Sequence, residues 1–270
     1  MTSNNWPGRL AGVLVALVLL LPYPTSNQPA AEPLRIGTFN APPHMFSEQG
    51  DTASGPGVEY FRELLQRMGQ DEATFRSYPL SRLLFAINAG DIDIALFLMK
   101  TPEREKNLHF PESPFHATYA GIAVRANTPI TSITSPADLL GLRIGVWQDS
   151  YVSPFLKHPE LQILTIAGNN AVQRNLLRLQ AKRINAVYNP DIAVLRFRAR
   201  KLGLSEQIRL LPLPGPPVPI YPVFSDSCAP ELIPRYEAVV RSGTVPDYAV
   251  YLETFLEHLN LDGAQRSAPP

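Results

Sequence analysis

The sequence predicts an α/β protein in which strands alternate with helices. An apolar run over residues 92–98, broken only by Asp93, is typical of a strand that is buried on both faces of a parallel sheet. The β-α-β-α-β order over residues 34–98 predicts a right-handed α/β lobe with parallel strands. A second set of alternating segments follows over residues 119–224.

The first set of elements is defined by its hydrophobic patterns. Short runs of strand-forming residues predict strands at residues 34–39, 73–78 and 92–98. Apolar side chains at helical spacing predict a helix over residues 58–68. We expect Ser81 to cap a second helix that ends at Gly90.

The second set has the same character. Extended segments are predicted at residues 119–125, 142–147, 161–166, 184–188, 208–213 and 220–224. Helices are predicted to start near Ser135, to cover residues 170–182, to follow Asp191, and to cover residues 230–242 and 245–259.

Composition excludes several classes of partner and cofactor. The chain has 270 residues, enough for one or two domains at about 150 residues each. Its formal net charge is +0, which argues against nucleic-acid or membrane-surface binding through a basic field. The single cysteine, Cys228, excludes an intrachain disulfide and a cysteine-based zinc cluster. The five histidines show no metal-binding spacing, so no metal and no cofactor is expected.

The N-terminus predicts export. Arg9 precedes an unbroken apolar run over residues 10–21, and small and polar residues follow. This order is that of a secretory signal peptide over residues 1–31, with the mature chain starting between Asn27 and Glu32. An uncleaved anchor is the weaker alternative, because the run is shorter than the roughly 20 residues that span a bilayer. At the other end, residues 261–270 are expected to form a flexible tail.

A cationic side chain follows the buried strand at residues 92–98. Thr101, Glu103 and Arg104 come directly after it, and the carboxyl ends of parallel strands are where open α/β sheets bind ligands. The planar guanidinium of an arginine binds a carboxylate through two parallel hydrogen bonds. Arg104 is therefore a candidate ligand-binding residue. The alternative is that it pairs with Glu103 or Glu105 on a solvated turn.

Six segments, in order, resemble a known family. They are LRIGTFNAPPHMF, GPGVEYFRELLQRMG, AINAGDIDIAL, TPER with the downstream LHFPESPF, SPADLLGLRIGVWQDS and AKRINAVYNPDIA. With these segments the chain resembles the family 3 extracellular solute-binding proteins, the periplasmic receptors of polar amino-acid ABC importers.

The resemblance implies a two-lobed periplasmic-binding-protein fold of type II, with a ligand cleft between two α/β lobes joined by two hinge strands. Residues 33–122 and 218–260 would form lobe 1 and residues 123–217 lobe 2, with crossings near Ala123 and Pro217. A small-molecule ligand would hold the lobes closed for recognition by an ABC permease in the inner membrane. The resemblance also implies a periplasmic monomer without nucleic-acid partners.

The resemblance assigns roles to several residues. Arg104 falls on the family's arginine that pairs with the ligand's α-carboxylate. Phe46 and Phe39 fall near the aromatic residue that stacks over the ligand, although either suits the core equally well. Ser150 falls on the hydroxyl residue that supports the carboxylate from the second lobe, and Gln148 is a second polar contact there.

Departures from the family pattern leave the ligand open. Apolar residues 96–99 replace the usual small hydroxyl residues, so Met99 is expected to contact the ligand, together with Thr101. Pro190 stands where the family has the acid that binds an α-ammonium group, and Asp191 lies one residue beyond. The ligand is therefore an amino acid, or an apolar or aromatic carboxylate that lacks an ammonium group.

Several function classes remain after this reasoning. The leading prediction is a non-enzymatic solute-binding protein of an ABC importer, and a variant is a receptor for a membrane sensor. The runner-up is a periplasmic enzyme that resembles cyclohexadienyl dehydratases, with Asp191, Asp149 or Glu103 as its general acid. A relative whose cleft has lost ligand binding is the third. No nucleotide-binding or serine-hydrolase motif is present in the sequence.

Overall fold

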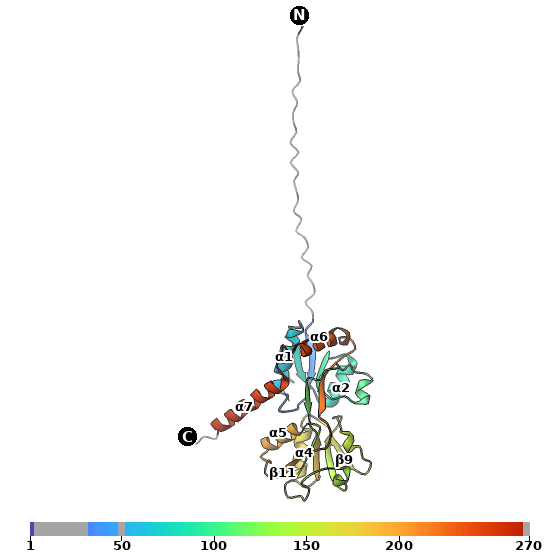
Figure 1. Cartoon of the computed structure of the whole chain (residues 1–270), viewed down its shortest axis with the longest axis vertical. Coiled ribbons are helices and arrows are strands. Elements are labelled where there is room, and N and C mark those ends of the chain that lie inside the picture. Colours follow the sequence, from blue (N-terminus) through green and yellow to red (C-terminus); the bar gives the residue numbers. More distant parts are fainter. Residues whose placement is uncertain (3–31, 48–51, 267–270) are drawn as a thin grey trace. The chain divides into compact units, whose positions relative to one another are not determined.

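Two five-stranded sheets organise the fold, which is seen here in a computed structural model (Figure 1). The structure describes residues 1–2, 32–47 and 52–266. Apart from its first two residues, the predicted signal peptide lies outside the described residues, as do residues 267–270 of the predicted tail. Residues from Pro33 onward belong to one compact unit.

The first sheet has the strand order β4-β1-β5-β12-β6. β1 (Leu34–Thr38) pairs in parallel with β4 (Ala73–Ser77) on one side and β5 (Ile94–Leu98) on the other. β12 (Val218–Phe224) pairs antiparallel with β5 and with β6 (His116–Thr118). All five residues of β5 are buried, which confirms the prediction of a strand covered on both faces.

The second sheet repeats this pattern in the order β11-β7-β10-β8-β9. β8 (Arg143–Trp147) pairs in parallel with β9 (Gln162–Ile166) and β10 (Ala186–Asn189). β7 (Gly121–Arg125) then pairs antiparallel with β10 and with β11 (Ile208–Pro212). Each sheet thus has four strands that run in one direction and one, β12 or β7, that runs against them, and the predicted α/β class is confirmed.

The chain crosses between the two sheets twice. It leaves the first sheet after Thr118 and enters the second at Gly121, and it returns between Pro212 and Val218. The lobe limits predicted from the sequence, 33–122 with 218–260 and 123–217, stay a prediction.

Helices cover both sheets (Figure 1). Around the first sheet lie α1 (Pro56–Arg67), α2 (Leu80–Ala89) and α6 (Ala229–Ser242), and α7 (Tyr248–Arg266) packs against α1. Around the second sheet lie α4 (Ala171–Gln180) and α5 (Ile192–Lys201). The remaining short elements are β2 (Phe46–Ser47), β3 (Ala53–Ser54), α3 (Pro102–Glu105) and two 3₁₀ turns at Pro136–Leu139 and Pro154–Leu156. α7 runs to Arg266 and so covers residues that the sequence assigned to the tail.

One predicted helix start is wrong. α2 begins at Leu80 with Pro79 at the N-cap, and Ser81 lies inside the first turn with an exposed side chain. Proline fits this boundary because the N–H that it lacks would have no partner at a helix start. The predicted end is confirmed, since Gly90 adopts φ 74, a left-handed conformation that glycine takes without strain.

A bulge interrupts the ladder between β5 and β12. Leu98 pairs with Tyr221 and Ala95 pairs with Val223, so two residues of β5 face the single residue Pro222. Phe97, one of the two, has φ 62, which is unusual for a bulky side chain. Proline is tolerated at a bulge because it has no N–H to donate to the ladder. Bulges redirect side chains, and Phe97 lines the pocket described below.

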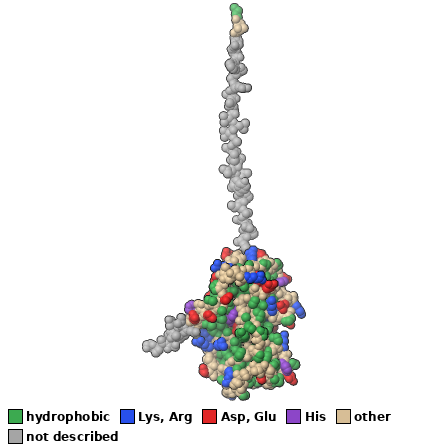
Figure 2. Space-filling model, viewed as in Figure 1, with side chains coloured by type: hydrophobic (Ala, Val, Ile, Leu, Met, Phe, Trp, Pro, Cys, Tyr) green, Lys and Arg blue, Asp and Glu red, His purple; other side chains and the backbone are tan. Residues whose placement is uncertain are grey.

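The surface agrees with the balanced composition. On the face seen in Figure 2, positive and negative side chains are interspersed rather than gathered by sign. In the described parts of the chain, no helix is long and apolar enough to cross a membrane.

Candidate ligand-binding cleft

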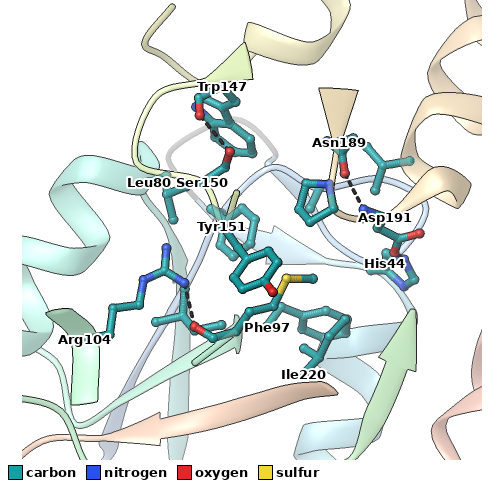
Figure 3. Close-up of a pocket in the computed structure, with 16 residues that line it drawn as sticks. His44, Leu80, Phe97, Arg104, Trp147, Ser150, Tyr151, Asn189, Asp191 and Ile220 are labelled. Carbon is teal, nitrogen blue, oxygen red and sulfur yellow. Dashed lines mark hydrogen bonds and ion pairs between the residues drawn. The ribbon is translucent and has the colours of Figure 1, made fainter. Parts of the chain in front are cut away.

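A pocket lies between the two sheets, at the carboxyl ends of parallel strands from both (Figure 3). Its walls come from the segments that follow β1, β5, β8 and β10 and from the starts of α2 and α5. Such strand ends are the usual ligand site of open α/β sheets. The residues that line it are Phe39, Ala41, His44, Leu80, Phe97, Leu98, Met99, Arg104, Trp147, Ser150, Tyr151, Asn189, Pro190, Asp191, Val194 and Ile220.

The pocket is small and mainly apolar in its lining. Its volume is about 60 Å³, whereas sites for drug-sized ligands measure roughly 300 Å³ or more. Aromatic rings from both sheets meet in it: Phe39 packs edge-to-face on Trp147 with ring centroids 5.6 Å apart. A cavity of this volume suits a small solute.

Arg104 reaches the pocket from α3. The hydroxyl of Thr101 caps this short helix and accepts a hydrogen bond from the Arg104 backbone N–H at 3.2 Å. The guanidinium donates to the carbonyl of Met99 at 2.8 Å. It also donates at 2.7 Å to the carbonyl of Asp149, which lies in the turn after β8 of the second sheet. Among the described residues none forms a salt bridge with Arg104, so the alternative pairing with Glu103 or Glu105 is not found. Burial lowers the pKa of Arg104 to about 10, which leaves it protonated at neutral pH.

The turn after β8 presents backbone to Arg104. Asp149 has φ 62, a left-handed conformation in which aspartate is tolerated better than most residues. The next residue closes the turn, because the Ser150 hydroxyl donates to the Trp147 carbonyl at 2.7 Å and the Ser150 N–H donates to the same oxygen at 3.2 Å. This turn fixes the Asp149 carbonyl that receives the guanidinium.

A buried polar chain crosses the same pocket. His44 Nε2 donates to Asp191 Oδ2 at 2.7 Å, and His44 Nδ1 lies 2.7 Å from the Tyr248 hydroxyl. The three residues are only 2%, 5% and 1% exposed, respectively. They come from the β1–β2 loop, the N-cap of α5 and the first residue of α7. Because Asp191 belongs to the second-sheet side, this chain of hydrogen bonds ties the two halves of the pocket together.

Close packing positions His44. The backbone N–H of Gly57 in α1 donates to the His44 carbonyl at 2.9 Å. A Cβ atom at position 57 would lie 2.7 Å from the Phe97 ring and 3.0 Å from the His44 carbonyl oxygen. Glycine is required here because α1 approaches both groups too closely for a side chain.

The charge states of this cluster follow from its surroundings. Burial acts to raise the pKa of Asp191, but the hydrogen bond and charge of His44, with hydrogen bonds from Thr118 and Ala193, outweigh it and lower the pKa. The neighbouring His116 ring lies 5.9 Å from His44, and burial together with the His44 charge lowers the pKa of His116 to about 4. Burial also raises the pKa of Tyr248 well above its ordinary value. Asp191 is therefore ionised and His116 neutral at pH 7.

The structure brings together five of the predicted ligand contacts and separates three others. The residues that line the pocket are Phe39, Met99, Arg104, Ser150 and Asp191. Phe46 packs instead on Phe197 and Phe255, with ring centroids 5.9 and 5.5 Å away. Thr101 caps α3, and the residue Gln148 is exposed. Ligand contact by any of the eight stays a prediction.

Sequence reasoning did not single out His44, Trp147, Tyr151 or Tyr248. The first lies in the segment NAPPHMF, directly after the first strand, and its place in that loop is the one signal that could have marked it. Tyr248 enters the site from a helix at the far end of the chain, 204 residues away from His44, and no local pattern indicates that contact. In the described parts of the chain no cluster of histidine, cysteine or acidic residues is arranged to hold a metal.

Comparison with solved structures identifies the fold. An ancestral arginine-binding protein bound to arginine is similar with a TM-score of 0.68 and 20% identity, covering 82% of this chain and 97% of that one. A histidine kinase sensor domain with similarity to periplasmic binding proteins gives a TM-score of 0.67 and 19% identity, covering 83% and 96%. A solute receptor for L-cysteine from Neisseria gonorrhoeae gives a TM-score of 0.63 and 21% identity, covering 88% and 94%.

At these identities the likeness establishes the fold alone, the two-lobed fold of periplasmic binding proteins. No curated protein has a sequence that matches this chain significantly. The profile of one family matches residues 34–266, which is nearly all of the chain after the predicted signal peptide. The chain therefore belongs to the bacterial extracellular solute-binding proteins, family 3.

Proposed function

We propose that this protein captures a small carboxylate-bearing solute in the cleft between its sheets and delivers it to an ABC importer. The observation that carries the proposal is the Arg104 guanidinium, which lines the pocket and donates only to the backbone carbonyls of Met99 and Asp149 among the contacts described. A carboxylate is a stronger acceptor for a guanidinium than a carbonyl, because the hydrogen bonds are then charge-assisted. An incoming carboxylate would compete for these donors.

Contacts between the sheets support a closing mechanism. Besides the contacts of Arg104 with Asp149 and of His44 with Asp191, the Asn40 amide donates to the Asn170 side chain at 3.2 Å. All three contacts link segments of the first sheet to segments of the second. Opening the cleft would break them, and a ligand held by both sides would favour the closed form. The closed form would be the one that the permease recognises.

Binding accounts for the site better than catalysis does. The dehydratase alternative needs a general acid that is free to donate to the substrate. Both ring nitrogens of His44 are occupied, and Asp191 accepts from His44 and from the Ala193 N–H at 2.8 Å. A sensing role for a membrane partner uses the same ligand-driven closure. Uptake assays in cells with and without the protein separate transport from sensing.

A thermal-shift screen tests the binding role. The mature chain would be screened against amino acids, aliphatic and aromatic acids, and dicarboxylates. A ligand that binds only the folded state stabilises it by about 2.7 kcal/mol at a hundredfold excess over Kd. We expect a clear shift with at least one carboxylate, lost in Arg104→Ala and kept in Arg241→Ala, a control arginine outside the pocket that pairs with the exposed Glu112. No shift with any carboxylate would contradict the proposal.

A further inference from the structure

The charges of the pocket are paired unequally. Asp191 is the only carboxylate among the described residues that line the pocket, and its oxygens accept from His44 Nε2 at 2.7 Å and from the Ala193 N–H at 2.8 Å. Arg104 is not paired with a carboxylate in the described structure and donates only to two carbonyls. The pocket therefore holds a cation without an acidic partner and an acid that already accepts a hydrogen bond from a buried histidine.

Other polar side chains that line the pocket also make hydrogen bonds within the protein. The Asn189 side-chain oxygen accepts from the Asp191 N–H at 2.8 Å, and the Ser150 hydroxyl donates to the Trp147 carbonyl. A buried ammonium group needs acceptors for its three N–H donors, and leaving it without them is costly. Three of the roughly four acceptor positions of the Asp191 carboxylate are used, by His44, Thr118 and Ala193, so an α-ammonium group would have to share this carboxylate with the buried His44. Among the described residues, Asp191 is the one carboxylate that could bind an ammonium group in the pocket, and it already accepts hydrogen bonds from other residues of the protein.

Apart from the Tyr151 hydroxyl, the rest of the wall is mainly apolar. Phe97, which lies in the β5 bulge with φ 62, lines the pocket together with Met99 and Trp147. These side chains offer packing for a hydrocarbon group, and the indole N–H of Trp147 is their one hydrogen-bond donor. The small cavity favours a compact apolar body over a long or charged one.

We infer that the solute is a small monocarboxylate with an apolar body and without an α-ammonium group. This inference rests on the proposed function and narrows it to one chemical class. Arg104 binds the carboxylate, the Phe97–Met99–Trp147 wall covers the hydrocarbon part, and the His44–Asp191 pair stands in the place that an ammonium group would need.

Matched acids test this directly by isothermal titration calorimetry on the mature chain. Each pair differs only in the ammonium group: 4-methylpentanoate against leucine, and 3-phenylpropanoate against phenylalanine. We expect the acid without nitrogen to bind at least about tenfold more tightly in whichever pair binds, the cost of an unsatisfied buried donor. Equal or tighter binding of the amino acid overturns this inference and leaves the proposed function standing. If no carboxylate binds, in these pairs or in the wider screen, the proposed function fails and the inference fails with it.

Two variants separate the role of the pair from a general loss of structure. Asp191→Asn keeps the size of the side chain and removes its negative charge, so the carboxylate is expected to bind several-fold more tightly. A receptor that used Asp191 for an ammonium group would instead lose amino-acid affinity in this variant. His44→Gln removes the imidazole that is hydrogen-bonded to Asp191 and should reduce the preference for the acid without nitrogen. An unchanged preference in both folded variants, checked by circular dichroism, would overturn the assignment.

Discussion

The Nε2 atom of His44 lies 2.7 Å from the Oδ2 atom of Asp191, and both residues are buried, although 147 residues separate them in the chain. His44 belongs to the loop after β1 of the first sheet, and Asp191 begins α5 beside the second. One hydrogen bond thus joins the two halves of the cleft. Removing one partner of a buried pair leaves the other buried without a hydrogen-bond partner. This lowers the free energy of unfolding far more than the loss of a surface pair does.

The stability of the closed form is predicted to depend on this pair. Asp191→Ala should lower the free energy of unfolding by about 3–5 kcal/mol, because it leaves His44 buried without its acceptor. The exposed pair of Arg241 and Glu112 is the control, and Glu112→Ala should cost no more than about 1 kcal/mol. Urea unfolding followed by circular dichroism measures both. Equal losses in the two variants would show that the His44–Asp191 contact does not stabilise the fold.

Acid sensitivity is predicted from His116. The lowered pKa, about 4, means that the unfolded chain binds a proton at this position below about pH 6.5 while the folded chain does not. Stability therefore falls as the pH falls from about 6.5 toward 4, and the lowered pKa of Asp191 adds a loss in the same direction at still lower pH. Between pH 6.5 and 4.5 the parent chain should lose about 1–2 kcal/mol of unfolding free energy through this histidine, and His116→Asn should not show that loss. Parallel pH profiles of the two proteins would refute this.

Backbone strain gives a third prediction. Asp149 has φ 62 and Lys182 has φ 58, and both are exposed residues in a conformation that glycine adopts more easily. Asp149→Gly and Lys182→Gly should each change the unfolding free energy by up to about 1 kcal/mol in the stabilising direction. Only Asp149→Gly is expected to change ligand affinity as well, because the Asp149 carbonyl contacts Arg104. If Lys182→Gly altered affinity equally, the effect would not come from the cleft.

Packing at α1 gives a fourth. Gly57→Ala places a methyl group 2.7 Å from the Phe97 ring and 3.0 Å from the His44 carbonyl, so both must shift. We expect a loss of about 1–3 kcal/mol in stability and weaker ligand binding. Gly69→Ala would be a poor control, because the left-handed backbone at Gly69, with φ 75, would strain any alanine. A methyl group is itself no obstacle in this core, since Ala95 is fully buried in β5. A fully stable Gly57→Ala protein would show that this contact is loose.

Periodic elements were predictable because their patterns are local. The apolar run of β5 and the helical spacing in α1 each lie within a dozen residues, and both are confirmed. β2, β3 and β6 were missed as strands because two or three residues are too few to show a period. The start of α2 was misplaced because serine is a common N-cap residue, whereas the N-cap in the structure is Pro79.

The site was predictable only where its residues sit at strand ends. Arg104 was identified because it follows β5 directly, and the structure places it in the pocket. The chain from Tyr248 through His44 to Asp191 depends on contacts 204 and 147 residues apart, which no spacing rule can reveal. Phe46 shows the converse, since an aromatic residue near the right loop packs on Phe197 instead.

The central claim is that Arg104 binds the carboxylate of a small solute in the cleft. Calorimetric titration of the tightest ligand from the screen, beside its neutral primary amide, tests it most directly. The account predicts that the amide, and Arg104→Ala titrated with the acid, each weaken binding by about 30-fold or more, the loss expected from one partner of a desolvated charge pair. If the amide bound as tightly as the acid, or if Arg104→Ala bound unchanged, Arg104 would not be the carboxylate-binding residue.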